Sequence, residues 1–142
     1  MAYTPRKKII VPIDFSERSF DAVDAALEMA ESPAAVHVVY VLLDLSPMEP
    51  GEIWGTIDIA GRTKSALDAL KKRLAVPKYE GVQCSVEFGD PSTVVTQLAQ
   101  KEKADLIVLT SHGRTGLSHL LIGSVAERIV RTAHCPVLVL RK

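Results

Sequence analysis

The feature that most constrains this sequence is a regular alternation between short apolar runs and segments with helical periodicity. Within the first helical segment, for example, Phe20, Val23 and Leu27 recur at the spacing of one helix face. This order predicts β-α-β-α-β-α-β-α-β, with parallel strands, right-handed crossovers and helices on both faces of one sheet. The expected strands are residues 9–11, 36–43, 82–88, 106–109 and 136–140.

The apolar runs differ in how deeply they should be buried. The second, fourth and fifth are nearly continuous in Val, Ile and Leu, which favours burial on both faces. Residues 82–88 alternate apolar and polar side chains, so we expect an edge strand with one solvated face. Pro12 would remove a hydrogen bond from a central strand, so we place it at the last turn of the first strand, where it holds Asp14 at the carboxyl edge.

Capping and turn residues mark where the helices should begin or end. Ser16 is a plausible N-cap for the first helix, Pro77 follows the second, and Gly89-Asp90-Pro91 leads into the third. Ser124 should open the fourth helix, and residues 44–55 should form a loop that contains Trp54. The expected inner face of the third helix is Val94, Val95, Leu98 and Ala99, and the fourth helix carries the apolar residues Val125, Ile129 and Val130.

Length and charge narrow the class of protein. A chain of 142 residues is expected to form one domain, residues 1–142. Seventeen Lys and Arg balance 17 Asp and Glu, which argues against a nucleic-acid or membrane binder that relies on bulk charge. The apolar runs are far shorter than the roughly 20 residues of a membrane-spanning helix. Cys84 and Cys135 form no metal or disulfide pattern, so we expect buried thiols in a reducing cytoplasm.

Two segments carry unusual residues at the carboxyl edge, where open α/β sheets bind ligands. These are residues 12–14 and residues 110–113. After the second, Gly113 and Gly116 would let backbone N–H groups approach a ligand closely, and Arg114 adds a positive charge. The start of a helix at Ser124 would add orphan N–H donors, which favour phosphate.

The same residues also have an interpretation without a ligand. Residues 124–127 form the capping-box pattern Ser-x-x-Glu, and Gly113 and Gly116 could serve only as turn residues. Known phosphate motifs do not fit, because the chain contains no Gly-Lys pair and has Ser111 where a dinucleotide fingerprint would need glycine. Local chemistry leaves both interpretations open.

Taken together, several segments resemble the universal stress proteins. The C-terminal signature of that family is similar to residues 111–116, 123–127 and 134–139. Residues 9–16 resemble its first strand and turn, and residues 89–91 resemble the turn after its third strand. The resemblance implies a Rossmann-like fold of the adenine nucleotide alpha hydrolase type, with strand order 3-2-1-4-5, and usually a homodimer.

The ATP-binding branch of that family carries Gly-x2-Gly-x9-Gly-Ser/Thr. Gly113 and Gly123-Ser124 match the later elements, but Thr110 replaces the first glycine. By resemblance, Asp14 would lie near the adenosine and the backbone of Val41 would meet the adenine. The full set of expected nucleotide-binding residues is Pro12, Asp14, Val41, Leu109, Thr110, Ser111, His112, Gly113, Arg114, Gly116, Gly123, Ser124 and Val125.

The resemblance implies a regulatory stress-response protein that binds ATP, ADP or AMP, with or without Mg²⁺, and acts on an unidentified protein partner. The alternative is an ATP-independent, partner-binding stress protein in which the glycine loop is only structural, and Thr110 is a step in that direction. An adenine nucleotide α-hydrolase is disfavoured because Asp14-Phe15-Ser16 replaces the glycine-rich first turn of such enzymes. We assign no catalytic residue, because His112 has no adjacent nucleophile or acid. ATP hydrolysis would at most be slow and incidental, and the histidine spacing predicts no structural metal.

The last apolar run favours a homodimer. In the implied strand order, residues 136–140 form an edge strand, and an apolar free edge invites aggregation. Pairing with a second copy across a two-fold axis would cover this edge, and Val139→Lys should weaken the pairing. Trp54 could close over a ligand or cover the rim of the dimer.

Overall fold

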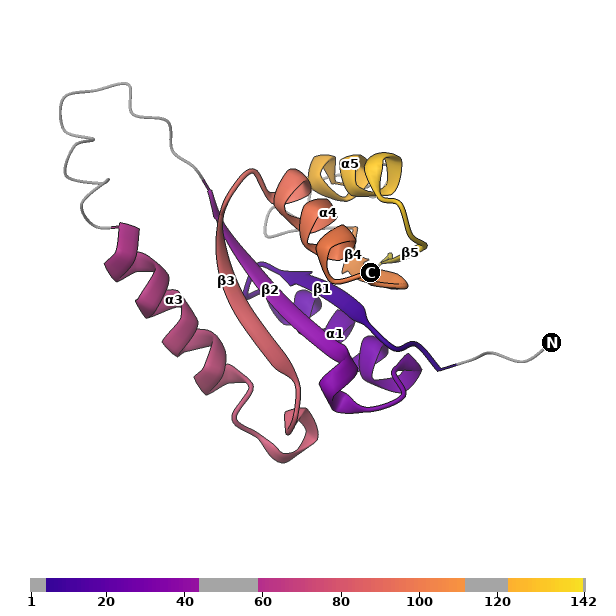
Figure 1. Ribbon diagram of the computed structural model, residues 1–142. Coiled ribbons are helices and arrows are strands. Elements are labelled where there is room, and N and C mark those ends of the chain that lie inside the picture. The colour runs from indigo at the N-terminus through magenta and orange to yellow at the C-terminus, as the bar shows by residue number, and fades with distance from the viewer. Residues whose placement is uncertain (1–4, 44–58, 112–122, 142) are drawn as a thin grey trace, which may run out of the picture.

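The structure is a computed structural model that describes residues 5–43, 59–111 and 123–141. Its centre is a five-stranded parallel sheet in the order β3-β2-β1-β4-β5 (Figure 1). This confirms the predicted fold class and strand order. The strands are β1 (Ile9–Ile13), β2 (Val36–Leu43), β3 (Gln83–Gly89), β4 (Leu106–Thr110) and β5 (Val137–Leu140).

Helices cover both faces of the sheet, as predicted. On one face, α1 and α3 pack over a cluster that includes Ile9, Val11 and Leu70 (Figure 1). On the other face, α4 and α5 pack over a cluster that includes Ile10 and Ile107. The described helices are α1 (Glu17–Met29), α3 (Ile59–Arg73), α4 (Pro91–Lys101) and α5 (Ser124–Thr132), with short 3-10 turns η1 (Pro33–Ala35) and η2 (Pro77–Tyr79).

Burial explains most of the strand patterns. The side chains of Ile9, Ile10 and Ile107 are fully buried, because successive residues of β1 and β4 face the two helix layers in turn. β3 is an edge strand, as predicted, but the expected alternation of buried and solvated residues was wrong: Gln83 and Phe88 are exposed and the residues between them are partly buried. The expectation for β5 was wrong, because its residues are only partly buried and Leu138 is 36% exposed. Leu138 belongs to the face covered by α1, and α1 packs on β4 and β1 rather than on β5.

Two of the predicted helix starts are confirmed by their caps. The hydroxyl of Ser16 accepts the Ser19 N–H at 3.2 Å, and a carboxylate oxygen of Asp90 accepts the Thr93 N–H at 3.0 Å. The hydrogen bond from the Thr93 N–H, helped by the Ser92 and Thr93 hydroxyls, lowers the pKa of Asp90 below its ordinary value. These bonds satisfy N–H groups that a helix start otherwise leaves unpaired.

α5 begins at Ser124, as predicted, but only some of its apolar residues are buried. Gly123 is the N-cap and Ser124 the first helical residue, so Ser124 forms no capping box. The buried residues are Ala126 and Ile129, whereas Val125 and Val130 are 42% and 47% exposed. Apolar character alone does not identify the buried face of α5, because the contacts of α5 with α4 and β5 set its rotation.

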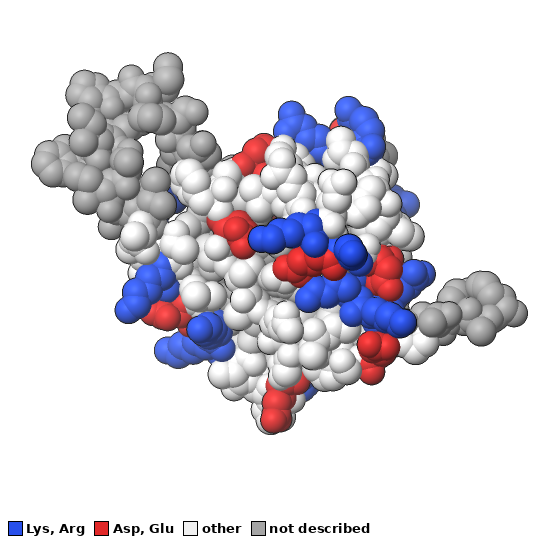
Figure 2. Space-filling model, in the orientation of Figure 1, with Lys and Arg blue, Asp and Glu red and all other residues white. Residues whose placement is uncertain are grey.

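Charge on the surface is mixed in sign. Lys and Arg side chains lie among Asp and Glu side chains on the face of the molecule that Figure 2 shows. This agrees with the balanced composition of 17 basic and 17 acidic residues. Within the described residues, no helix is both long enough and apolar enough to cross a membrane.

Candidate functional site

The candidate site lies at the carboxyl edge of the sheet, where β1 separates from β4. From Ile9 to Ile13, every residue of β1 pairs with β2, but only Ile9 and Ile10 pair with β4. Pro12 is the next-to-last residue of β1, as predicted, and has no N–H to donate to a neighbouring strand. The strand order reverses at this point, which is where open α/β sheets bind their ligands.

Asp14 follows β1 directly and is held by a tight turn. Its Oδ1 accepts the Ser16 N–H at 2.9 Å, and its own N–H donates to the Ser19 hydroxyl at 3.4 Å. Between them, Phe15 has a φ of 68°, in the left-handed region that is costly for a bulky side chain. Asp14 therefore helps to fix the turn before α1, and this contact uses one of its two carboxylate oxygens.

A close backbone contact joins the end of β4 to the start of α5. The Ser111 N–H donates to the Leu140 carbonyl at 2.8 Å, and the Gly123 N–H donates to the Ser111 carbonyl at 2.7 Å. A Cβ atom at Gly123 would lie 3.1 Å from that carbonyl oxygen. The φ of Gly123 is −63°, which any residue can adopt, but a side chain here would require the Ser111 carbonyl to move by a few tenths of an ångström.

This contact brings the first turn of α5 to the carboxyl edge of the sheet. Ser124 and Val125 are exposed, and no described side chain caps the helix. The first N–H groups of an uncapped helix point outward and carry partial positive charge, so they suit a phosphate group. Because the capping box is absent, the hydroxyl of Ser124 does not serve as the helix cap.

Of the other predicted residues, three lie in described strands and the rest lie outside the described residues. Val41 is half-buried and Leu109 is only 4% exposed, and both pack in the α4/α5 cluster, so only their backbone groups face the edge. Thr110 is the half-buried last residue of β4. His112, Gly113, Arg114 and Gly116, together with the Trp54 loop, lie outside the described residues.

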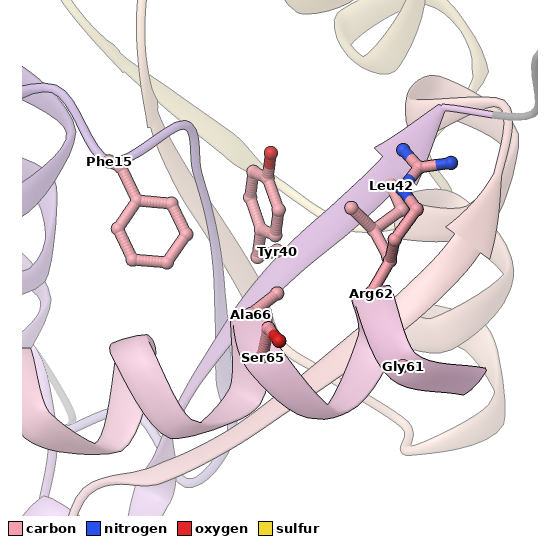
Figure 3. Close-up of a pocket in the computed structure, with 7 residues that line it drawn as sticks. All are labelled: Phe15, Tyr40, Leu42, Gly61, Arg62, Ser65 and Ala66. Carbon is pink, nitrogen blue, oxygen red and sulfur yellow. The ribbon is translucent and has the colours of Figure 1, made fainter. Parts of the chain in front are cut away.

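A hollow lies on the face of the sheet opposite α5, between β2 and α3. This open cavity of about 430 Å³ is lined by Phe15, Tyr40, Leu42, Gly61, Arg62, Ser65 and Ala66 (Figure 3). The rings of Phe15 and Tyr40 meet edge to face, with centroids 4.8 Å apart. Tyr40 packs with the α1/α3 cluster, whereas its neighbour Val41 packs with the α4/α5 cluster. The cavity is therefore separate from the start of α5, and no sequence motif pointed to it.

Sequence comparison identifies the family. The profile of the universal stress protein family matches residues 5–141. The chain belongs to the universal stress protein family. Universal stress protein MJ0531 of Methanocaldococcus jannaschii is 39% identical over 141 residues, covering 96% of this chain and 82% of that protein. Universal stress protein A homolog 1 of Coxiella burnetii is 35% identical over 139 residues, covering 93% and 94%.

Solved structures of universal stress proteins share the fold. Protein MJ0577 of M. jannaschii is 27% identical and superposes with a TM-score of 0.77 over 98% of each chain. UspA from Lactobacillus plantarum, 23% identical, gives 0.78 over 97% of this chain and 100% of that one. A universal stress protein solved in complex with cAMP, 24% identical, gives 0.59 over 96% and 98%. In the described part of the chain, no cluster of three His, Cys, Asp or Glu side chains could hold a metal ion.

Proposed function

We propose that this universal stress protein binds an adenine nucleotide, ATP in the first place, at the carboxyl edge between β1 and β4. The observation that carries the proposal is the 2.7 Å hydrogen bond from the Gly123 N–H to the Ser111 carbonyl. It holds the uncapped start of α5 beside the end of β4, at the point where β1 and β4 stop pairing. N–H donors at such a position are suited to phosphate oxygens.

In this proposal the phosphates meet the N–H groups of Ser124 and Val125 and the Ser124 hydroxyl. Gly113, Gly116, His112 and Arg114, outside the described residues, would complete the phosphate site, with or without Mg²⁺. The adenosine lies near Pro12 and Asp14, with the backbone of Val41, Leu109 and Thr110 beside it. The relative solved with cAMP supports this ligand class, because it has the same fold.

Calorimetric titration of nucleotide-stripped protein with ATP and Mg²⁺ tests the proposal. We expect a micromolar Kd. Ser124→Ala should weaken binding about tenfold, since one hydrogen bond to a charged group contributes roughly 1.5 kcal/mol. Ser32→Ala is the matched control: Ser32 is exposed, opens η1 without a side-chain cap, and precedes β2 at the opposite edge. No binding by the folded protein would favour the second candidate, an ATP-independent partner-binding protein in which Thr110 closes the site.

We also propose that the chain is a single domain that forms a homodimer in the cytoplasm and regulates a protein partner according to its bound nucleotide. β5 is an edge strand, and Leu138 on β5 is exposed, as are Val125 and Val130 on α5. A second copy would bury this apolar edge. Cys84 and Cys135 are free thiols that are only partly buried, so the expectation that they are buried was wrong.

Substitution at Leu138 provides the cleaner test of the dimer. Val139, the position indicated by the sequence, packs in the α4/α5 cluster, so a lysine there would also disturb the core. Leu138→Lys places a charge on the exposed side of β5, and light scattering at micromolar concentration should show a shift from dimer to monomer. Val76→Lys, at a 41% exposed site after α3, should leave the dimer intact. A monomeric unsubstituted protein would contradict the proposal.

A further inference from the structure

A chain of hydrogen bonds joins three side chains at the amino edge of the sheet, far along the strands from the candidate nucleotide site. The Ser85 hydroxyl lies 2.7 Å from Nε2 of His37, and Nδ1 of His37 lies 2.9 Å from Oε1 of Glu102. His37 is the second residue of β2 and is 7% exposed. Ser85 comes from β3 and is partly exposed, and Glu102 follows the last residue of α4.

The direction of each hydrogen bond in this cluster follows from which groups can donate a hydrogen and which can only accept one. An ionised carboxylate only accepts hydrogen bonds, so Nδ1 of His37 carries the hydrogen that faces Glu102. In a neutral imidazole the other nitrogen is then an acceptor, and the Ser85 hydroxyl donates to it. A hydroxyl that donates to a histidine, which a carboxylate orients in turn, is the arrangement of an activated serine nucleophile.

Lys8 is the other charged side chain beside Glu102. Its Nζ lies 3.2 Å from Oε1 of Glu102 and 3.4 Å from the side-chain oxygen of Gln83. Partial burial raises the pKa of Glu102, but the hydrogen bond from His37, with Lys8 beside it, outweighs burial and leaves that pKa below its ordinary value. Among the described residues, Glu102 and Lys8 are the charged groups in contact with this cluster.

We propose that Ser85 is a nucleophile that accepts an acyl group from small activated esters, with His37 as general base and Glu102 as positioning residue. The Ser85 oxygen forms a bond to the carbonyl carbon, and the bond from that carbon to the leaving oxygen breaks. The hydroxyl proton passes to Nε2 of His37 and then to the departing oxygen. The product is an O-acyl serine and a free alcohol, so no oxidant or metal is required.

Acetylation by p-nitrophenyl acetate, followed by peptide mass mapping of the whole protein, tests this proposal. Ser32 is exposed and has no histidine partner among the described residues, so it is an internal control in the same digest. We expect Ser85 to be acetylated at least ~100-fold faster than Ser32, within the usual range for general-base assistance. The rate at Ser85 should rise with pH until the imidazole is neutral and then level off.

Substitutions then separate nucleophilic activation from a purely structural role. His37→Gln should slow labelling of Ser85 by about 100-fold. Glu102→Gln keeps the shape of the side chain and should slow it less, while shifting the pH profile. Circular dichroism establishes that each variant is folded. If His37→Gln does not fold, the pH profile of the unsubstituted protein decides. Equal labelling of Ser85 and Ser32, or a rate that rises with hydroxide without levelling, would overturn the proposal and leave a structural link between β2, β3 and α4.

Discussion

Gly123→Val is expected to weaken nucleotide binding at the carboxyl edge by more than roughly 100-fold. A Cβ at this position would lie 3.1 Å from the Ser111 carbonyl oxygen, and that oxygen belongs to the backbone and cannot rotate away. The two extra methyl groups of valine would push the start of α5 from the end of β4. The N–H donors of Ser124 and Val125 would then miss the phosphates. The loss of two charge-assisted hydrogen bonds, about 3 kcal/mol together, weakens binding by more than 100-fold.

Calorimetry on three variants makes this result specific. Gly123→Ala adds only the first carbon and should give an intermediate Kd. Gly61→Val carries the same substitution into an exposed position of α3, on the other face of the sheet, and should bind as the unsubstituted protein does. If folded Gly123→Val binds ATP with unchanged affinity, the start of α5 does not form the phosphate site.

Ile107→Ala is expected to cause the largest loss of stability. Ile107 is fully buried in the α4/α5 cluster and is paired with Ile10 of β1 and Val137 of β5. Truncation removes three buried carbon atoms between a helix layer and the sheet, where close packing prevents full collapse. The expected cost is about 3–4 kcal/mol. That is a large share of the roughly 5–15 kcal/mol by which domains of this kind are stable.

Urea unfolding followed by far-UV circular dichroism measures this loss, at one protein concentration because a dimer would couple stability to concentration. Val76→Ala is the matched control. Val76 is 41% exposed, so its truncation should change the free energy of unfolding by less than about 0.5 kcal/mol. A loss below about 1 kcal/mol for Ile107→Ala would mean that the centre of the sheet repacks around the cavity, against the general behaviour of buried sites.

The sequence predicted the architecture because its largest signals are local and repeated. Strands that are buried on both faces must be continuously apolar, and the helices between them must present one apolar face. Ser16 and Asp90 also work locally, since a cap bonds to N–H groups only a few residues away. The resemblance to universal stress proteins then gave the strand order, which periodicity alone does not contain.

Contacts between distant parts of the chain escaped prediction. The capping box that the sequence left open at Ser124 does not form. Gly123 is the N-cap of α5, and its N–H bonds to the carbonyl of Ser111, a contact that no local propensity describes. The link of His37 to Ser85 and Glu102 has the same origin, since three elements meet there only when the sheet is assembled. The sequence thus determined the order of strands and helices by where apolar side chains had to be buried. The tertiary structure alone decided which polar groups meet, because hydrogen bonds depend on distances that only packing sets.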